Sequence, residues 1–451
     1  MFLIFQFNNK SSYLYLRILY KVHMKWIICS LALLGATTIN AQTISVSPYS
    51  ALGVGEQLYN NNSEINGMGG ITTVPTNPYG QSANFSNPAA NQDLRMTNFN
   101  FSGRGDSNSF KTETESKTAG SFKLSNISLA FPVSKKSALG IGFQPYTGLG
   151  YNISNGKKTT QGLSQQSIMT GDGGINSLHA FYNYNVNNNL SFGLRANYLF
   201  GQLKTNELVT VEGASLIADY DTKANYKGVQ FTLGSMYKLK LENKKNLNIG
   251  AYYTIGTKLN TDLKELTSTY SAFYPSDKSL DTVYYNRSTK LKTQLPSIIA
   301  LGASYSKDNS WSIGGELRYN TWSNFSKPSL GGLSTVQANT KYKDNLYVGV
   351  GGYWVPNFNS YRSYFSRVVY RGGLYYESAP YSIYGHDIER YGVTIGAGLP
   401  IGKQNDASMI NVSLEYGQKG TDKYQLIKED YVGFKIGFDI NDIWFRKRVI
   451  D

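Results

Sequence analysis

The sequence predicts an all-β protein, a 14-stranded antiparallel transmembrane β-barrel with an N-terminal plug segment. Apolar and polar residues alternate in repeated segments of roughly ten residues, the pattern of barrel strands. The connections between these segments alternate between short and long. Beyond the first 41 residues, no apolar run approaches the ~20 residues of a membrane helix, and a closed barrel is the other structure that satisfies its backbone inside a bilayer.

The alternation is clearest at 311–320, where Trp311, Ile313 and Leu317 share one parity, whereas Glu316 and Arg318 share the other. An even number of strands is expected when both chain ends lie in the periplasm. Fourteen candidate strands lie near 97–104, 122–132, 138–152, 174–186, 190–198, 229–234, 247–253, 299–305, 311–320, 345–355, 367–377, 393–397, 412–416 and 432–438.

The connections predict which end of the barrel faces the periplasm, because such barrels have short periplasmic turns and long external loops. One connection departs from this rhythm: Pro356 to Ser366 is long for a periplasmic turn and rich in Tyr and Arg. A soluble β-sandwich, the alternative, explains neither the rhythm nor the aromatic residues on one parity. Short turns are expected at 133–136, 186–189, 242–245, 306–309 and 403–406, and long loops at 105–121, 153–173, 204–223, 259–293, 323–343, 378–388 and 418–430.

Residues 1–41 are expected to form a signal peptide that exports the chain to the outer membrane of a Gram-negative cell. The stretch contains four basic residues and no acidic one, and its apolar run from Ile27 to Ala36 is too short to span a bilayer. Cleavage is predicted after Ala41, and Met24 is a candidate for the true start. The single cysteine, Cys29, lies in this stretch, so the mature chain is expected to hold no disulfide, thiolate metal site or cysteine nucleophile.

The chain is basic, with 44 Lys and Arg against 30 Asp and Glu. Because it is exported and its basic residues are scattered, we expect outer-membrane lipid rather than nucleic acid as the partner of this charge. An enzyme is not expected: His179 and His386 are far apart, and Ser177 two residues before His179 occurs by chance in any serine-rich strand. No spacing suggests a metal site, and no cofactor is predicted.

Residues 42–95 precede the first strand, and we assign the barrel to 96–451. Gly and Pro punctuation, as in Gly67-Met68-Gly69-Gly70 and Asn87-Pro88-Ala89, argues against barrel strands there. The segment either extends into the periplasm or folds back as a plug, since 14 strands enclose enough lumen to hold one.

Pro145 is the most informative local anomaly, because a proline inside a strand cannot donate to the ladder. It marks either a bulge near a strand end or a local opening of the wall. Inward parity places Arg195, Glu316, Arg318, Arg371 and Glu415 in the lumen. Their mixed signs favour a salt-bridged lining or an anchor for the plug over an ion-selective pore.

Three stretches resemble the FadL-type family of outer-membrane transporters for long-chain fatty acids and other hydrophobic compounds. They are Gly67–Gly70 with Asn87-Pro88-Ala89, then Phe131 to Gly150, and then Trp311 to Pro380. The opening Ser47-Pro48-Tyr49-Ser50 and the ending Asn441 to Phe445 resemble a Bacteroidetes branch. The resemblance implies that Gly67, Gly69, Gly70, Asn87, Pro88 and Ala89 belong to a plug, and that Pro145, Tyr146 and Gly148 border a lateral opening.

Two functions remain open at this point. One is passive diffusion of a fatty-acid-like or hydrocarbon ligand past the plug and out through the wall, as the resemblance implies. The other is a non-transporting structural subunit of an outer-membrane protein assembly or secretion complex, with other outer-membrane proteins as partners. The polar external loops and the long Tyr- and Arg-rich turn motivate the second.

Overall fold

The computed structural model describes residues 45–58, 62–75, 78, 82–271, 282–325, 339–401 and 407–444. These belong to one compact unit, Thr43–Asp451. The expected signal peptide and the alternative start at Met24 lie outside the described residues. No helix among the described residues has the length and apolarity to cross a membrane.

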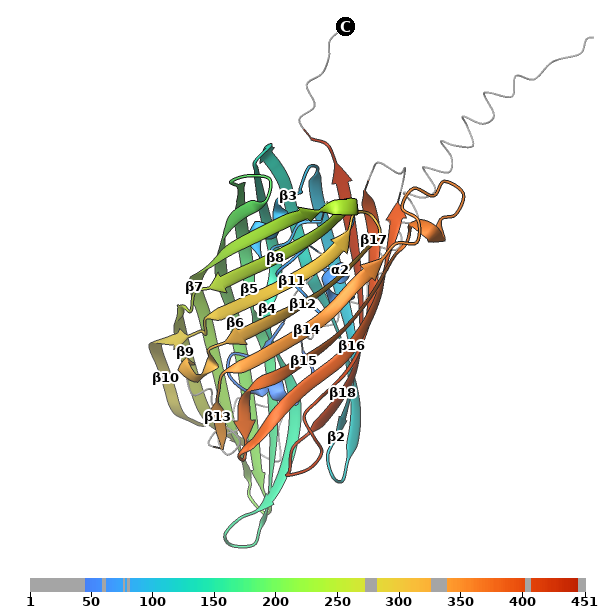
Figure 1. The fold of residues 1–451 in the computed structure, drawn as a ribbon. Helices are drawn as coiled ribbons and strands as arrows, with labels where there is room; N and C mark the ends of the chain where they lie inside the picture. Colours follow the sequence, from blue (N-terminus) through green and yellow to red (C-terminus); the bar gives the residue numbers. More distant parts are fainter. Residues whose placement is uncertain are drawn as a thin grey trace, which may run out of the picture. The chain divides into compact units, whose positions relative to one another are not determined.

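The described strands form one antiparallel sheet that closes on itself, because the last strand, β18, pairs with β2 from Thr97–Asp442 to Lys111–Lys428 (Figure 1). The wall strands are β2 (Thr97–Lys111), β3 (Ser116–Ser134), β4 (Ser137–Lys158), β5 (Ser164–Asn185), β6 (Leu190–Val211), β7 (Leu216–Leu241), β8 (Lys245–Thr254), β9 (Lys258–Ser271), β10 (Thr282–Gln294), β11 (Ile298–Lys307), β12 (Trp311–Asn320), β13 (Thr340–Tyr342), β14 (Asn345–Trp354), β15 (Val369–Ile383), β16 (His386–Ile401), β17 (Ser408–Lys419) and β18 (Lys428–Asp442).

The described wall has fourteen strands, as predicted, because three of them are interrupted. β8 and β9 both pair with β7, so they are two parts of one strand. β10 and β11 pair with β9 and β8 in the same way, and β13 and β14 both pair with β15. The remaining strand, β1 (Glu56–Gln57), is not part of the closed wall.

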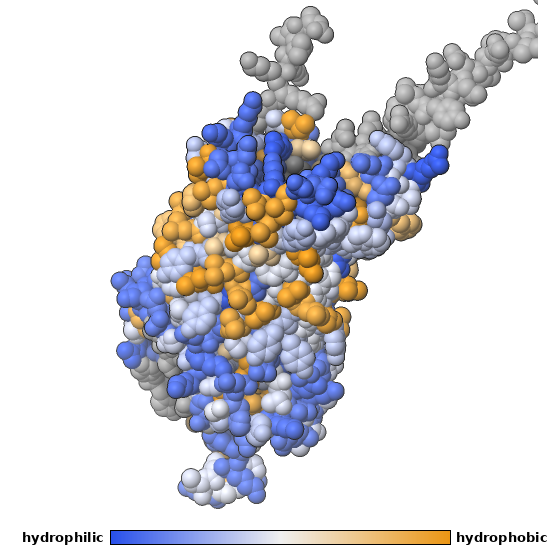
Figure 2. Space-filling view, viewed as in Figure 1, coloured by the Kyte–Doolittle hydropathy of each residue, from blue (hydrophilic) through white to orange (hydrophobic). Residues whose placement is uncertain are grey.

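The predicted alternation separates the two faces of the wall. Leu301, Leu317 and Leu374 are more than half exposed on the outside, while Ser304, Glu316 and Glu377 are buried within. Figure 2 shows apolar residues concentrated between two more polar ends, the arrangement required by a bilayer around the barrel.

Several predicted loops are instead continuous strand. The expected loops at 153–173, 204–223 and 259–293 are mostly parts of the long hairpins β4–β5, β6–β7 and β9–β10. In β9, for example, the outward residues Asn260, Asp262 and Lys264 are polar, while Leu259 and Leu263 face inward. The outward apolar residues that mark a lipid-facing strand are therefore missing there, although backbone pairing continues. The prediction of loops there was wrong for this reason.

At the opposite end the described turns are short, with β3 and β4 separated by two residues and β5 and β6 by four. The β14–β15 connection is the exception predicted from the sequence, running from Val355 to Val368 around the short 3-10 helix η6 (Phe365–Arg367). The expected turn at 403–406 lies outside the described residues.

The described part of the N-terminal segment, residues 45–96, lies within the wall (Figure 1, blue). It contains η1 (Pro48–Ala51), β1, the one-turn helix α2 (Ser63–Asn66) and η2 (Pro88–Asn91). α2 contacts β16, β17 and β18, whereas η2 contacts β5, β6 and β7. The segment therefore touches opposite parts of the inner wall.

Candidate functional site

The wall is split between β3 and β4. Their pairing runs from Ser134–Ser137 to Ile127–Phe143 and stops there, although both strands continue. Each strand carries an irregularity near this point, at Ser125 on β3 and at Tyr146 on β4. β-bulges bend strands and end pairing, which accounts locally for the separation. We call this separation the β3–β4 seam.

The N-terminal segment replaces β3 as the neighbour of β4 beyond the seam. Leu58 N–H donates to Tyr146 O at 3.1 Å, and Glu56 and Gln57 pair with Gly148 and Thr147. Further along, the Ser50 hydroxyl donates to Gly150 O and accepts from Gly150 N–H, both at 3.1 Å. Thus Thr147 and Gly148 of β4 have backbone partners on both sides.

Gly55 permits this close approach. Its φ is +93°, which disfavours other residues, and a Cβ there would lie 2.7 Å from Gly148 O. Gly148, predicted to border a lateral opening, is therefore covered by the N-terminal segment. Pro145 is the last residue paired with β5 before the bulge at Tyr146.

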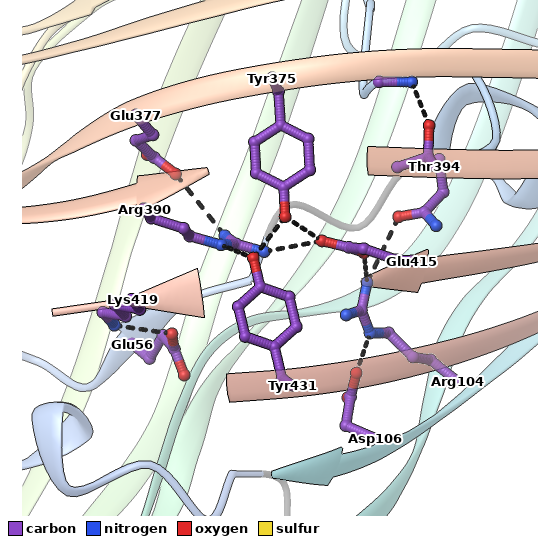
Figure 3. A network of polar contacts seen from close by, with 12 residues as sticks. Glu56, Arg104, Asp106, Tyr375, Glu377, Arg390, Thr394, Glu415, Lys419 and Tyr431 are labelled. Carbon is purple, nitrogen blue, oxygen red and sulfur yellow. Dashed lines mark hydrogen bonds and ion pairs between the residues drawn. The ribbon is translucent and has the colours of Figure 1, made fainter. Parts of the chain in front are cut away.

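A network of charged and aromatic side chains lies inside the barrel next to β1 (Figure 3). Arg390 on β16 is flanked by Tyr375 and Tyr431, with its guanidinium carbon 5.3 and 5.2 Å from the two ring centroids. It also forms ion pairs with Glu415 at 3.1 Å and Glu377 at 3.6 Å. Side chains from four neighbouring strands, β15 to β18, thus meet at Arg390.

The network extends across β2 and β3. Arg104 pairs with Asp106 at 2.6 Å and with Glu415 at 2.8 Å, while Lys123 on β3 contacts Asp106 at 3.2 Å. Because cations and anions alternate, the attraction is distributed over the whole group, as expected for charges away from bulk water.

Glu56 joins the N-terminal segment to this network through a 2.9 Å ion pair with Lys419 on β17. Burial alone would raise the pKa of the Glu56 carboxyl. The positive charges of Lys419 and Arg390 outweigh this effect and lower the pKa to about 2. Glu56 is therefore a carboxylate at neutral pH.

A cavity of about 100 Å³ lies within this network, lined among others by Gln57, Leu58, Arg104, Ser121 and Lys123. It reaches both sides of the β3–β4 seam, since Gln57 and Leu58 pair along β4 and Ser121 and Lys123 belong to β3. A space of this size and polarity fits a few water molecules. The chamber beside the seam is consequently polar.

The apolar part of the lumen is packed. Val54 of the N-terminal segment belongs to a buried cluster with Leu149 on β4, Leu203 on β6 and Leu259 on β9. Each of these side chains is at most 1% exposed. Side chains rather than open space occupy this region.

The motif residues predicted for the plug lie against the inner wall. Asn87 Oδ1 accepts from Ala89 N–H at 3.1 Å, and its Nδ2 donates to Thr73 O at 2.8 Å and to Ser235 O at 3.2 Å. A Cβ on Gly234 would overlap Asn87 Oδ1, and one on Gly193 would overlap Pro88. Wall glycines thus allow the Asn-Pro-Ala turn to reach the backbone.

The Gly67–Gly70 motif follows α2 and contacts a different part of the wall. Gly69 N–H donates to Thr394 at 2.9 Å, and its carbonyl accepts from the Tyr347 hydroxyl. Gly69 has a φ of +67°, and a Cβ there would lie 2.8 Å from Leu374 O. Gly67 lies against Arg371 and Gly396, and Gly70 O accepts from Arg318 at 3.3 Å.

Most of the charged residues predicted to line the lumen contact the N-terminal segment. Glu316 pairs with Arg318 at 2.5 Å and accepts from Thr72 and Thr73 N–H at 2.5 and 2.8 Å. Arg195 donates to Phe85 O. Arg371 donates to Asn411 at 2.9 Å and lies 3.7 Å from Glu64, whereas Glu415 belongs to the network around Arg390.

Sequence reasoning missed several members of that network, namely Glu56, Arg104, Asp106, Arg390 and Lys419. Inward parity on β2 and β16 would have identified Arg104 and Arg390. Nothing local marks Glu56, because β1 has two residues and no alternation.

Among the described residues, no group of three or more His, Cys, Asp or Glu side chains could hold a metal ion. His179 is buried edge-on against Phe85, 4.8 Å between ring centroids.

A family model described as BamG matches residues 23–451. The barrel also resembles solved outer-membrane channels. The Pseudomonas putida toluene transporter TodX has a TM-score of 0.57 and 15% identity, covering 86% of this chain and 98% of TodX. The Ralstonia pickettii toluene transporter TbuX has a TM-score of 0.54 and 15% identity, covering 84% of this chain and 98% of TbuX. A Pseudomonas aeruginosa FadL homologue has a TM-score of 0.53 and 13% identity, covering 84% of this chain and 98% of the homologue. At this identity the likeness establishes the fold. No curated protein matches the chain.

Proposed function

The chain belongs to the BamG family, and from the chemistry of its lumen we propose that it is a non-transporting structural barrel subunit of an outer-membrane protein assembly. The observation that supports this proposal is the charged, ion-paired lining of the cavity beside the seam. An apolar solute moving from the lumen towards the seam would meet Arg104, Asp106 and Lys123 there.

Opening such a route is energetically unfavourable. Separating a buried ion pair without replacing its partner costs about 3–5 kcal/mol, and an apolar solute offers no replacement. The alternative route through the apolar lumen is occupied by side chains packed against Val54. The packing around Val54 closes that part of the lumen, and the outer wall and the periplasmic end remain available to other proteins.

Gentle detergent extraction followed by mass measurement tests this function. We expect the barrel to migrate in a complex with other outer-membrane proteins. A difference in gel migration between boiled and unboiled samples would verify that the barrel is folded. A folded monomer together with uptake of toluene or a long-chain fatty acid by proteoliposomes would overturn the proposal.

A second function, passage of small hydrophobic compounds past the N-terminal segment and out through the wall, is favoured by one observation. The β3–β4 pairing ends at Ile127–Phe143, next to the irregularity at Pro145 and Tyr146. In this proposal Pro145, Tyr146 and Gly148 border a lateral exit, and β1 must leave Gly148 before a solute passes.

Replacement of Pro145 by valine tests this second function. Valine can donate to the ladder and favours strands, so the exit should close and uptake of fatty acids or aromatic hydrocarbons should fall. Pro132→Val, on the paired part of β3, is the matched control. Unchanged uptake in Pro145→Val cells, or equal loss in both variants, would exclude a specific exit at Pro145.

A further inference from the structure

The β14–β15 connection, Val355 to Val368, forms a defined projection at the periplasmic end of the barrel (Figure 1, orange loop). Asn357 N–H donates to Ser366 O at 2.8 Å, which closes the base of the loop. Tyr364 hydroxyl donates to Pro400 O at 3.2 Å, and Val355 N–H donates to Ser310 O at 2.6 Å. The loop is therefore tied to both neighbouring strand ends.

Its tip presents aromatic side chains to solvent. Tyr361 is 89% exposed and Phe365 is 72% exposed, and all residues from Tyr361 to Phe365 are exposed. An ordered loop that displays rings loses little conformational entropy on binding, so such rings are effective anchors for a partner. The composition of Tyr, Asn, Ser and Arg is also that of protein-binding loops.

The loop carries charge of one sign. Arg362 lies at the exposed tip and Arg367 contacts the Tyr364 ring, 5.6 Å from its centroid. No Asp or Glu occurs from Val355 to Tyr376. A complementary surface would therefore present carboxylates next to apolar pockets.

We infer that this loop is the docking surface for a periplasmic protein with an acidic face, which binds Arg362 and Arg367 and accepts the Tyr361 and Phe365 rings. The inference rests on the proposed structural role and names the surface by which the barrel joins its partner. Inner-leaflet phospholipid is the other possible occupant. It is less suited, because the rings of the tip are interspersed with Asn359, Ser360 and Ser363, and Trp354 and Tyr370 already supply exposed aromatic residues at the wall.

Site-specific photo-cross-linking of the full chain in its native cells tests the inference. The probe p-benzoylphenylalanine replaces Tyr361, and a matched probe replaces Tyr424, an exposed tyrosine at the opposite end. We expect a protein adduct of one mass from position 361 alone, with the linked peptide located in an Asp- and Glu-rich surface. Reversal of both charges by Arg362→Glu and Arg367→Glu should reduce that adduct about tenfold, because like charges then face each other.

Lys135→Glu with Lys136→Glu, on the β3–β4 turn at the same end, controls for the general charge of the rim and should leave the adduct unchanged. A phospholipid adduct, no adduct, or an adduct equally strong after reversal at 362 and 367 would overturn the inference. If the barrel still co-extracts with other proteins in that case, the structural role stands and only the docking surface is wrong. A folded, transporting monomer would instead overturn the structural role itself.

Discussion

The Glu316 carboxylate on β12 accepts the backbone N–H of Thr72 at 2.5 Å and thereby joins the barrel wall to the segment inside it. The same carboxylate pairs with Arg318, and Arg318 in turn donates to Gly70 O. A polar anchor of this kind holds the segment in one position, because the Glu316 carboxylate accepts from two consecutive backbone N–H groups, those of Thr72 and Thr73.

Glu316→Gln should weaken this anchor. The variant keeps the shape of the side chain but leaves Arg318 without its anionic partner, so we expect a loss of about 3–5 kcal/mol in the free energy of unfolding. Denaturant titration of the refolded barrel measures it. Glu113→Gln, on an exposed loop, should change stability by less than about 0.5 kcal/mol. Equal stabilities of the two variants would contradict the anchor.

Gly234→Ala should displace the Asn87-Pro88-Ala89 turn, because a Cβ at this position overlaps Asn87 Oδ1. Crowding of this type costs about 1–3 kcal/mol. Protease cleavage within residues 84–92 of the folded barrel should accelerate. Gly156→Ala is the matched control, since a Cβ there meets nothing within 4 Å. Protection as strong as in the parent protein would show that the turn does not depend on this contact.

A disulfide should form between Gln57→Cys and Thr147→Cys, since the two residues are partners in an antiparallel pair. Their Cα atoms are then about 4.5–5.5 Å apart, within disulfide range. The pair Leu124→Cys with Thr147→Cys should stay reduced, because β3 and β4 are separated there. Thiol labelling after mild oxidation distinguishes the two pairs. Efficient oxidation of the second pair would mean that the seam is closed.

Acid should loosen β1 through Glu56. Its pKa is lowered to about 2 by Lys419 and Arg390 against the effect of burial. The folded pKa lies below the ordinary value near 4.5, so this contribution is complete above about pH 4.5 and is lost as the pH falls towards 2. The labelling rate of Gln57→Cys, divided by that of Gly156→Cys at an open position to remove the pH dependence of the thiol itself, should increase as the pH falls through that range. Glu56→Gln should remove the dependence, and an identical acid profile in that variant would assign it to another group.

The strands that face lipid were predictable, because each presents an apolar and a polar face with a two-residue period. This local pattern identified fourteen segments and placed Glu316, Arg318, Arg371 and Glu415 on the inward parity. The pattern did not identify the wall beyond the apolar band, as in the β9–β10 hairpin. Lipid does not contact that part of the wall, so its outer face does not need apolar residues.

The sequence by itself determined a closed barrel, because alternation follows from burying one side of each strand in lipid and requires no knowledge of its neighbours. Only the tertiary structure decided which groups meet inside. Glu56 faces Lys419, 363 residues away, and β1 replaces β3 beside β4, because segments far apart in the chain share one enclosed volume. Their contacts depend on charge pairing and close packing in that volume, which the two-residue alternation along the sequence does not predict.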